Sequence, residues 1–199
     1  MPPRVKVIRR LGTPLPGLTR KVADRRPYPP GVHGARSRLR KTDYRRQLEE
    51  KQKVRFHYGV SESQLRRYLA RTTGEEARHG GTRLALLERR LDNVVFRLGW
   101  APTIPAARQL VGHGHVRVNG RRLDRPSYLV KIGDELALAG RARQMASVVA
   151  AVERGPEVSL PGYLKRESDP YAGCVIGLPS RGDIPFEVEE MAVIEFYAR

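Results

Sequence analysis

The strongest hydrophobic pattern in the chain lies between residues 82 and 98. Large aliphatic side chains recur there every three or four positions, the period of an amphipathic helix; they are Leu84, Leu87, Leu91, Val94, Val95 and Leu98. A shorter stretch with the same period follows at 103–111, after Gly99 and a connection of only three residues, Trp100-Ala101-Pro102. The pattern predicts two helices, over 82–98 and 103–111, that cross closely because their connection is so short.

Beyond residue 115 the spacing of apolar positions changes from about 3.6 to 2. Val116 and Val118 flank a polar residue, and Asn119-Gly120 follows before a second short strand. Asn-Gly favours a β-hairpin because both central residues of its turn need positive φ. Two further short strands and then a helix are predicted over 128–130, 135–138 and 143–153. Because helices precede a mainly antiparallel sheet, the predicted fold class is α+β.

The N-terminal part reads differently. Residues 1–41 are poor in large apolar side chains and rich in Pro, Gly and Arg, so we expect an extended arm that its partner orders. A helix is predicted over 43–58, which contains neither Gly nor Pro and is followed by Gly59. Ser61 and Gln64 have the spacing of a capping box, which predicts a second helix from that point.

Charge adds a partner to this fold. The chain has 199 residues, with 38 Lys+Arg against 21 Asp+Glu, a formal net charge of +17. The charge is +13 over residues 1–60, +8 over 61–149 and −4 over 150–199. Arginine, which binds phosphate through two parallel hydrogen bonds and stacks on bases, outnumbers lysine by 31 to 7. The basic residues 1–149 favour binding to a polyanion, and the acidic residues 150–199 favour a different kind of partner.

Several function classes lack their sequence signatures. The chain contains no GxxxxGK[ST], GxGxxG, HExxH or CxxC motif, and its single cysteine, Cys174, excludes a disulfide framework and a multi-cysteine zinc site. His113 and His115 lack a third ligand nearby, so phosphate contact or helix capping is favoured over metal binding. No run of about 18 apolar residues predicts a membrane span, and the first residues do not resemble a signal peptide. We therefore expect no catalysis, cofactor, metal or membrane contact, and a cytoplasmic protein.

Segments spread over the chain resemble a known family. The first set resembles, in order, the RNA-binding motif named after bacterial small-subunit ribosomal protein four: RRLDNVVFRLG (89–99), AARQLV (106–111), HGHV (113–116), VNG (118–120) and PSY (126–128). The second set extends the similarity to the family of that ribosomal protein: RPYPPGVHG (26–34), DY (43–44), LEEKQKVR (48–55), YG (58–59) and IEFYAR (194–199). The motif alone is shared with tRNA-synthetase tails, pseudouridine synthases and ribosome-rescue factors, whereas the combination is specific.

The resemblance implies a primary rRNA-binding protein of the small subunit. Family members bind a multi-helix junction in the 5′ region of the small-subunit rRNA, start assembly of the subunit body, and affect decoding accuracy with small-subunit proteins five and twelve. The chain lacks the four N-terminal cysteines with which some members bind zinc, so it resembles the zinc-free bacterial or plastid type, which would place it in the plastid stroma if it is plastid-encoded.

The family's organisation implies domain boundaries in this chain. We expect a basic extended arm at 1–41 and a helical domain at 42–88, which the C-terminal tail (about 194–199) joins. An α+β domain at 89–193 would follow, with the RNA-binding motif at about 89–150.

Candidate site residues follow from charge, spacing and the resemblance. Arg89, Asn93 and Arg97 recur every four positions and would share a helix face away from the aliphatic stripe. Gly31 and Gly34 lack side-chain bulk, which would let RNA approach the backbone closely. The rRNA-binding candidates are Lys6, Arg9, Arg10, Arg26, Tyr28, Pro30, Gly31, His33, Gly34, Arg36, Tyr44, Gln47, Lys51, Lys53, Arg55, Arg66, Arg67, Arg89, Asn93, Arg97, Thr103, Arg108, Gln109, His113 and His115.

Alternatives remain for these residues and for the chain. A basic helix face can simply be solvated, and Tyr44 and Tyr58 can be core residues rather than base-stacking ones. Glu187, Glu189 and Glu190 are candidates for a protein interface, because carboxylates repel phosphate. Two other functions are considered: an RNA-modifying enzyme with an RNA-binding tail, and a free-standing factor for stalled ribosomes. The enzyme is disfavoured because neither the segment before the motif nor the segment after it contains a recognisable catalytic pattern. The free-standing factor is disfavoured because it does not account for the +13 of residues 1–60 and for a helical domain.

Overall fold

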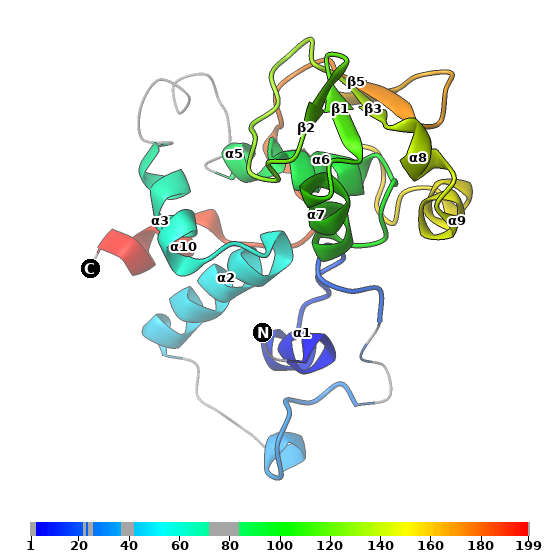
Figure 1. Ribbon diagram of the computed structural model, residues 1–199. Helices are drawn as coiled ribbons and strands as arrows, with labels where there is room; N and C mark the ends of the chain where they lie inside the picture. The colour runs from blue at the N-terminus through cyan, green and yellow to red at the C-terminus, as the bar shows by residue number, and fades with distance from the viewer. Residues whose placement is uncertain (1–2, 22, 24–25, 37–41, 72–83, 199) are drawn as a thin grey trace.

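The structure is a computed structural model that describes residues 3–21, 23, 26–36, 42–71 and 84–198. One part of the molecule is helical and joins the two ends of the chain (Figure 1). Its helices are α1 (Arg4–Leu11), α2 (Asp43–Tyr58), α3 (Glu62–Arg71) and α10 (Glu190–Ala198). The other part contains a β-sheet together with α5 (Ala85–Glu88), α6 (Leu91–Arg97), α7 (Ile104–Gly112), α8 (Gly140–Arg143) and α9 (Ala146–Arg154).

The sheet has the strand order β2-β1-β3-β5-β4, and every neighbouring pair is antiparallel. Its strands are β1 (Val116–Val118), β2 (Arg121–Leu123), β3 (Glu135–Leu138), β4 (Leu164–Arg166) and β5 (Ala172–Val175). Val116 and Val118 point into the core, and Arg117 between them is exposed opposite Arg122. Asn119 has a φ of 49°, as the predicted Asn-Gly turn requires. The hairpin, the strand at 135–138 and the α+β class are confirmed.

The helix predicted over 43–58 is confirmed as α2, together with the signals that bound it. Thr42 caps its start, with Oγ1 accepting from the amide of Arg45 at 3.3 Å, and Gly59 ends it with a φ of 61°. The capping box before α3 is present in both directions. Ser61 Oγ accepts from the Gln64 amide at 3.2 Å, and the Gln64 side chain accepts from the Ser61 amide at 3.1 Å.

The N-terminal segment is not extended throughout, and that expectation is wrong for residues 4–11. They form α1, whose Val7 and Ile8 are buried and which contacts α2. Leu15 and Leu18 follow with exposed fractions of 1% and 0%. Apolar side chains are few here, but Val7, Leu15 and Leu18 belong to the hydrophobic core and anchor the segment to it.

The single helix predicted over 82–98 is also corrected within the residues that the structure describes. Helices α5 and α6 are separate, because Arg90 between them is extended, with φ −66° and ψ 137°. The segment predicted as a strand at 128–130 pairs with this break. Leu91 donates its amide to the Tyr128 carbonyl at 2.8 Å, and Val130 donates to the carbonyl of Arg89 at 2.9 Å. A periodic stripe alone cannot reveal such a break, because the hydrogen bonds that stabilise it come from a distant segment.

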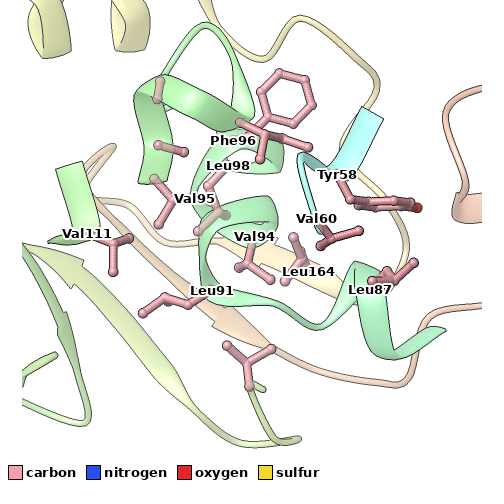
Figure 2. Packing of buried hydrophobic residues seen from close by; sticks show 14 of the residues in the cluster. Tyr58, Val60, Leu87, Leu91, Val94, Val95, Phe96, Leu98, Val111 and Leu164 are labelled. Atoms are coloured by element: carbon pink, nitrogen blue, oxygen red, sulfur yellow. The ribbon is translucent and has the colours of Figure 1, made fainter. Parts of the chain in front are cut away.

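Helix α6 lies at the centre of the molecule, with every residue buried. Figure 2 shows its Val94 and Val95 among Tyr58 and Val60 from the end of α2 and Leu164 of β4. A helix buried on all sides has no solvent-facing stripe, so its polar residues must find partners inside the protein.

The C-terminal part adds two features. The helix predicted over 143–153 is found as α9, after the separate short helix α8. Helix α10 lies along α2, so the end of the chain packs on the helical part (Figure 1). Gln47 of α2 donates to the carboxylate of Glu195 in α10 at 2.9 Å. None of the helices in the described ranges has the length and apolar content needed to cross a membrane.

Candidate nucleic-acid interface

The first basic surface is formed by α1 and the turn at residues 28–34. Arg9 connects the two, since its Nε donates to the carbonyl of Tyr28 at 3.0 Å and its guanidinium lies 5.2 Å from the centre of the Tyr28 ring. The exposed basic side chains around this contact define the N-terminal surface: Lys6, Arg10, Arg26, His33 and Arg36. Arg9 therefore positions this surface and is itself only half-exposed.

The glycines of this turn serve its shape. A Cβ on Gly34 would lie 1.8 Å from the carbonyl oxygen of Pro29, so the residue is buried against the turn rather than open for RNA to approach, which corrects the expectation. Gly31 has a φ of 111°, which side chains rarely tolerate, and nothing within 4 Å of its Cβ position. Tyr28 is 38% exposed beside them, and Pro30 is half-buried.

Two candidates on α2 are buried, and the expectation that they contact RNA is corrected. Lys51 is 5% exposed, with Nζ 3.0 Å from Glu62 and 4.6 Å from the centre of the Phe196 ring. Gln47 is 7% exposed and bonds Glu195. Both side chains hold the helical part together, because α3 and α10 cover the face of α2 on which they lie.

The other candidates of the helical part keep some exposure. Lys53 is 2.6 Å from Glu50, Arg55 is 4.0 Å from Glu62, and the Tyr44 ring lies 5.8 Å from that of Phe196. Arg66 and Arg67 project from the exposed face of α3. Of these five residues, Arg66 and Arg67 are the exposed cations, whereas Lys53 and Arg55 are half-buried.

Asn93 and Arg97 belong to a buried cluster centred on Glu88, so the face expected to be exposed is inside the protein. Glu88 is 0% exposed, and Asn93 Nδ2 donates to its carboxylate at 2.8 Å. Arg97, at 2% exposure, has Nε 3.4 Å from the same carboxylate. The hydroxyls of Tyr58 and Tyr163 also donate to it. Burial and the Glu88 charge raise the pKa of both tyrosines well above the usual value, so both remain donors.

A second buried acid, Asp92, fixes α7 to the end of α2. Its carboxylate accepts from Arg90 at 3.0 Å and from Arg108 at 2.6 Å. Arg108 also donates to the carbonyls of Gly59, at 2.7 Å, and Tyr58, at 2.9 Å. Arg108 therefore joins the helical part to the part with the sheet. Its side chain remains partly exposed and open to RNA.

Two further candidates serve local structure. Thr103 is 8% exposed and caps α7, with Oγ1 accepting from the amide of Ala106 at 3.4 Å. Arg89 is half-buried and donates to the carbonyl of Val130 at 3.0 Å. Both residues stabilise the local backbone of the RNA-binding motif.

A second basic surface lies at the end of α7 and on the β1–β2 hairpin. Gln109 and His113 are exposed, and the ring of half-buried His115 is 6.1 Å from that of His113. Arg122 packs directly over Gly114, because a Cβ there would lie 2.0 Å from the arginine Nε. We call this the hairpin surface; it comprises Gln109, His113, His115, Arg117 and Arg122.

Sequence reasoning missed the arginines of the hairpin. Arg117 and Arg122 are directly opposite in the antiparallel register and exposed on one face. Arg121 and Arg125 are exposed close by. The signal was present, because alternation in a strand with buried Val116 and Val118 places the residue between them on the outer face.

Gly114→Ala is expected to disturb the hairpin surface while leaving the fold intact. Gly114 has a φ of 72°, and the new Cβ would displace the guanidinium of Arg122. We expect a loss of about 1–2 kcal/mol in the free energy of unfolding, together with weaker RNA binding, measured by urea denaturation and filter binding. The matched control is Gly112→Ala, which has nothing within 4 Å of its Cβ position. Equal RNA affinity for the two variants would contradict the role of Arg122.

His57 makes stability depend on pH. It is 0% exposed between Phe186 and Tyr58, and neither ring nitrogen has a hydrogen-bond partner. Burial, and then the charge of Arg97, lower the pKa of His57 from 6.5 to about 3. The unfolded chain binds the proton more readily, so the stabilising contribution is complete above pH ~6.5 and falls by ~1.4 kcal/mol per pH unit towards pH ~3.

His57→Leu should therefore lose less stability than the parent protein as the pH falls from ~6.5 to ~4. The difference in the free energy of unfolding between the two proteins should shift in favour of the variant over this range. The measurement is urea denaturation at a series of pH values. His33→Leu, which changes an exposed histidine, is the control and should keep the parent's pH slope. Parallel pH curves for His57→Leu and the parent would contradict the assignment.

Comparison with known proteins covers both parts of the chain. Residues 2–88 match the Ribosomal protein S4/S9 N-terminal domain, and residues 89–136 match the S4 domain. The small ribosomal subunit protein uS4 of Methylobacillus flagellatus is 47% identical over 98% of this chain and 96% of its own length. The protein of the same name from Thermosynechococcus vestitus is 47% identical over 99% and 96%.

The chain belongs to the uS4 family. It is a ribosomal protein of the small subunit with an RNA-binding S4 domain, and the resemblance found in the sequence is confirmed. The uS4 N-terminal domain match ends at residue 88, where α5 ends, and the S4 domain match begins in the break before α6. The hairpin surface lies wholly within the S4 domain match, and the N-terminal surface lies within the other.

Proposed function

We propose that this uS4 protein binds the 5′ region of the small-subunit rRNA directly and nucleates assembly of the subunit body. The observation that carries the proposal is a pair of exposed basic surfaces, one in each family domain, on a chain of net charge +17. Inside the protein, Arg90, Arg97 and Arg108 are partnered by acids, whereas the arginines of the two surfaces face solvent. Exposed arginine is the residue best suited to phosphate.

The proposed contacts are those candidates that remain accessible. The N-terminal surface and the hairpin surface would contact phosphates, with Arg66 and Arg67 of α3 extending the contact. Tyr44, Lys53 and Arg55 of α2 would lie at its margin. Gln109 and the histidines would read 2′-hydroxyls and unpaired bases, which are the features that distinguish RNA.

The division of labour along the chain is also part of the proposal. The arm (1–41) and the α+β domain (89–193) would make most of the rRNA contacts. The helical domain (42–88), which the C-terminal tail joins, would position them and add the contacts of α2 and α3. The boundary of the family matches at residues 88 and 89 supports this division. The role is structural rather than catalytic, and no small-molecule substrate or cofactor is required.

The test compares rRNA fragments. The protein should bind a transcript of the 5′ region more tightly than a transcript of equal length from the 3′ region, and it should remain with the small subunit through a high-salt wash. In reconstitution, its omission should prevent later proteins from joining the 5′ region. Equal affinity for the two transcripts would leave only non-specific binding and would overturn the proposal.

The C-terminal end is proposed to contact small-subunit protein five and, through decoding, to act with protein twelve. Glu189 forms an ion pair with Arg46, and Glu190 lies 3.1 Å from Arg181, so both help to place the tail. Glu187 is exposed at the start of this segment and is the best placed of the three for another protein. The resemblance to the family, together with the acidic charge, supports this part of the proposal.

Cutting the chain after Met191 is expected to raise misreading while retaining most rRNA affinity. The cut removes most of α10 and uncovers the face of α2 that carries Gln47 and Lys51. The measurements are transcript binding by filter retention and a miscoding reporter. The control replaces Met191, a 60% exposed residue, with serine in the full-length chain. A collapse of rRNA binding with the fold retained would contradict the proposed division.

A further inference from the structure

Beside the hairpin surface lies a cavity that the basic charge alone does not explain. Its volume is about 220 Å³, and it lies between α7 and the start of α9. Its lining is largely apolar and includes Trp100, Leu110 and Val148. Polar groups line it as well, namely the amide of Gln109 and the rings of His113 and His115.

Size and lining restrict what the cavity can hold. Pockets for drug-sized ligands have about 300–1,000 Å³, so this smaller cavity suits one flat ring system. The apolar lining residues fit the faces of such a ring, and Gln109 and Ser147 can bond donors and acceptors on its edge. The imidazole rings in the lining add surfaces on which a base can stack.

The charge beside the cavity points to the same ligand. Arg122 lies against Gly114, which stands in the sequence between the two histidines that line the cavity. Arg122 is exposed, so its guanidinium is open to an anion beside the cavity. A largely apolar cavity with a guanidinium beside it is complementary to a nucleotide, whose base is flat and largely apolar on its faces and whose phosphate is anionic.

We propose that this cavity captures one unpaired nucleotide of the rRNA, with its base inside and its phosphate on Arg122. The inference rests on the proposed rRNA binding and names the feature that the S4 domain would recognise: a bulged or extruded base rather than a regular duplex. Regular RNA helices keep their bases stacked, so only an unpaired position can reach the cavity.

The protein contains its own reporter for this event. Trp100 is the only tryptophan in the chain, and it lines the cavity. A base that enters should change its fluorescence. The probes are RNA hairpins of one sequence that either are fully paired or carry a single unpaired nucleotide, with each of the four bases tested in turn.

We expect at least one bulged hairpin to change Trp100 fluorescence and to bind about tenfold more tightly than the paired hairpin, the size of one base-stacking contact. Ser147→Phe should fill the cavity and abolish both differences. Ala150→Phe places the same side chain at an exposed position of α9 outside the cavity and should preserve both. His113→Ala changes an exposed residue of the cavity lining, so the fold should be unaffected. It should reduce the preference for the bulged hairpin.

Equal fluorescence and equal affinity for the paired hairpin and all bulged hairpins would overturn the inference, as would a preference that survives Ser147→Phe. Either result would leave the proposed function standing, provided that the 5′-region transcript still binds. Failure of every hairpin and of that transcript to bind would instead count against RNA binding as a whole. The two proposals are therefore separately testable.

Discussion

Glu88→Ala is expected to be the most damaging single substitution in the protein, with a loss of about 3–5 kcal/mol in the free energy of unfolding. Four side chains from three segments bond or pair with this one fully buried carboxylate: Tyr58 of α2, Asn93 and Arg97 of α6, and Tyr163 before β4. Removing it leaves the guanidinium of Arg97 buried without a countercharge. Because domains are stable by only about 5–15 kcal/mol, a large part of the stability would be lost.

Guanidinium chloride denaturation of the purified protein measures this loss. Glu153→Ala, at an exposed position of α9, is the control and should change stability by less than about 0.5 kcal/mol. The double variant Glu88→Gln/Arg97→Met removes both charges at similar volume, so its loss should be smaller than the sum of the single losses. A loss below about 1 kcal/mol for Glu88→Ala would show that the cluster does not depend on this carboxylate.

The elements with local signals could be predicted from the sequence. Three such elements are present: helix α2, the capping box before α3 and the Asn-Gly hairpin. The signals that predict them come from residues close together in the sequence. The α+β class followed from their order. These features need no knowledge of distant contacts, which is why a single sequence reveals them.

The polar residues of the interior could not be predicted in the same way. Asn93 and Arg97 are polar residues at helical spacing, which normally indicates a solvated face. They are buried because α6 is covered on every side, and Glu88 and the carbonyl of Asp183 supply partners from other segments. Lys51 is buried for the same kind of reason, with Glu62 and Phe196 as its partners. Partners so far apart along the chain leave no local pattern.

The sequence therefore predicts the basic character of the candidate site but not which of its residues are exposed. Charge counts pointed to a polyanion and to residues 1–149, and that depends only on composition. Which arginines face outward depends on tertiary pairing: Arg97 and Arg108 meet acids, whereas Arg117 and Arg122 do not project into the core. The hairpin arginines were predictable from strand alternation alone, whereas the buried ones were not.

Affinity for the 5′-region transcript is expected to fall about 10³–10⁵-fold between ~50 and ~200 mM salt, as for a protein that contacts about 6–10 phosphates. The N-terminal surface and the hairpin surface together expose enough cationic side chains for that number of phosphates. Each phosphate that the protein binds releases counterions, so the logarithm of the affinity should fall linearly with the logarithm of the salt concentration.

The hairpin arginines supply a sharper version of this prediction. Replacing Arg117 and Arg122 with glutamine should reduce the salt slope by about 1 for each phosphate that the protein no longer binds. The matched control is Arg154→Gln/Lys165→Gln, which removes the same charge from two exposed positions outside both surfaces. Because overall charge changes equally, only direct binding of phosphate separates the two variants. The same slope in both would mean that the hairpin arginines attract RNA at a distance without touching its phosphates.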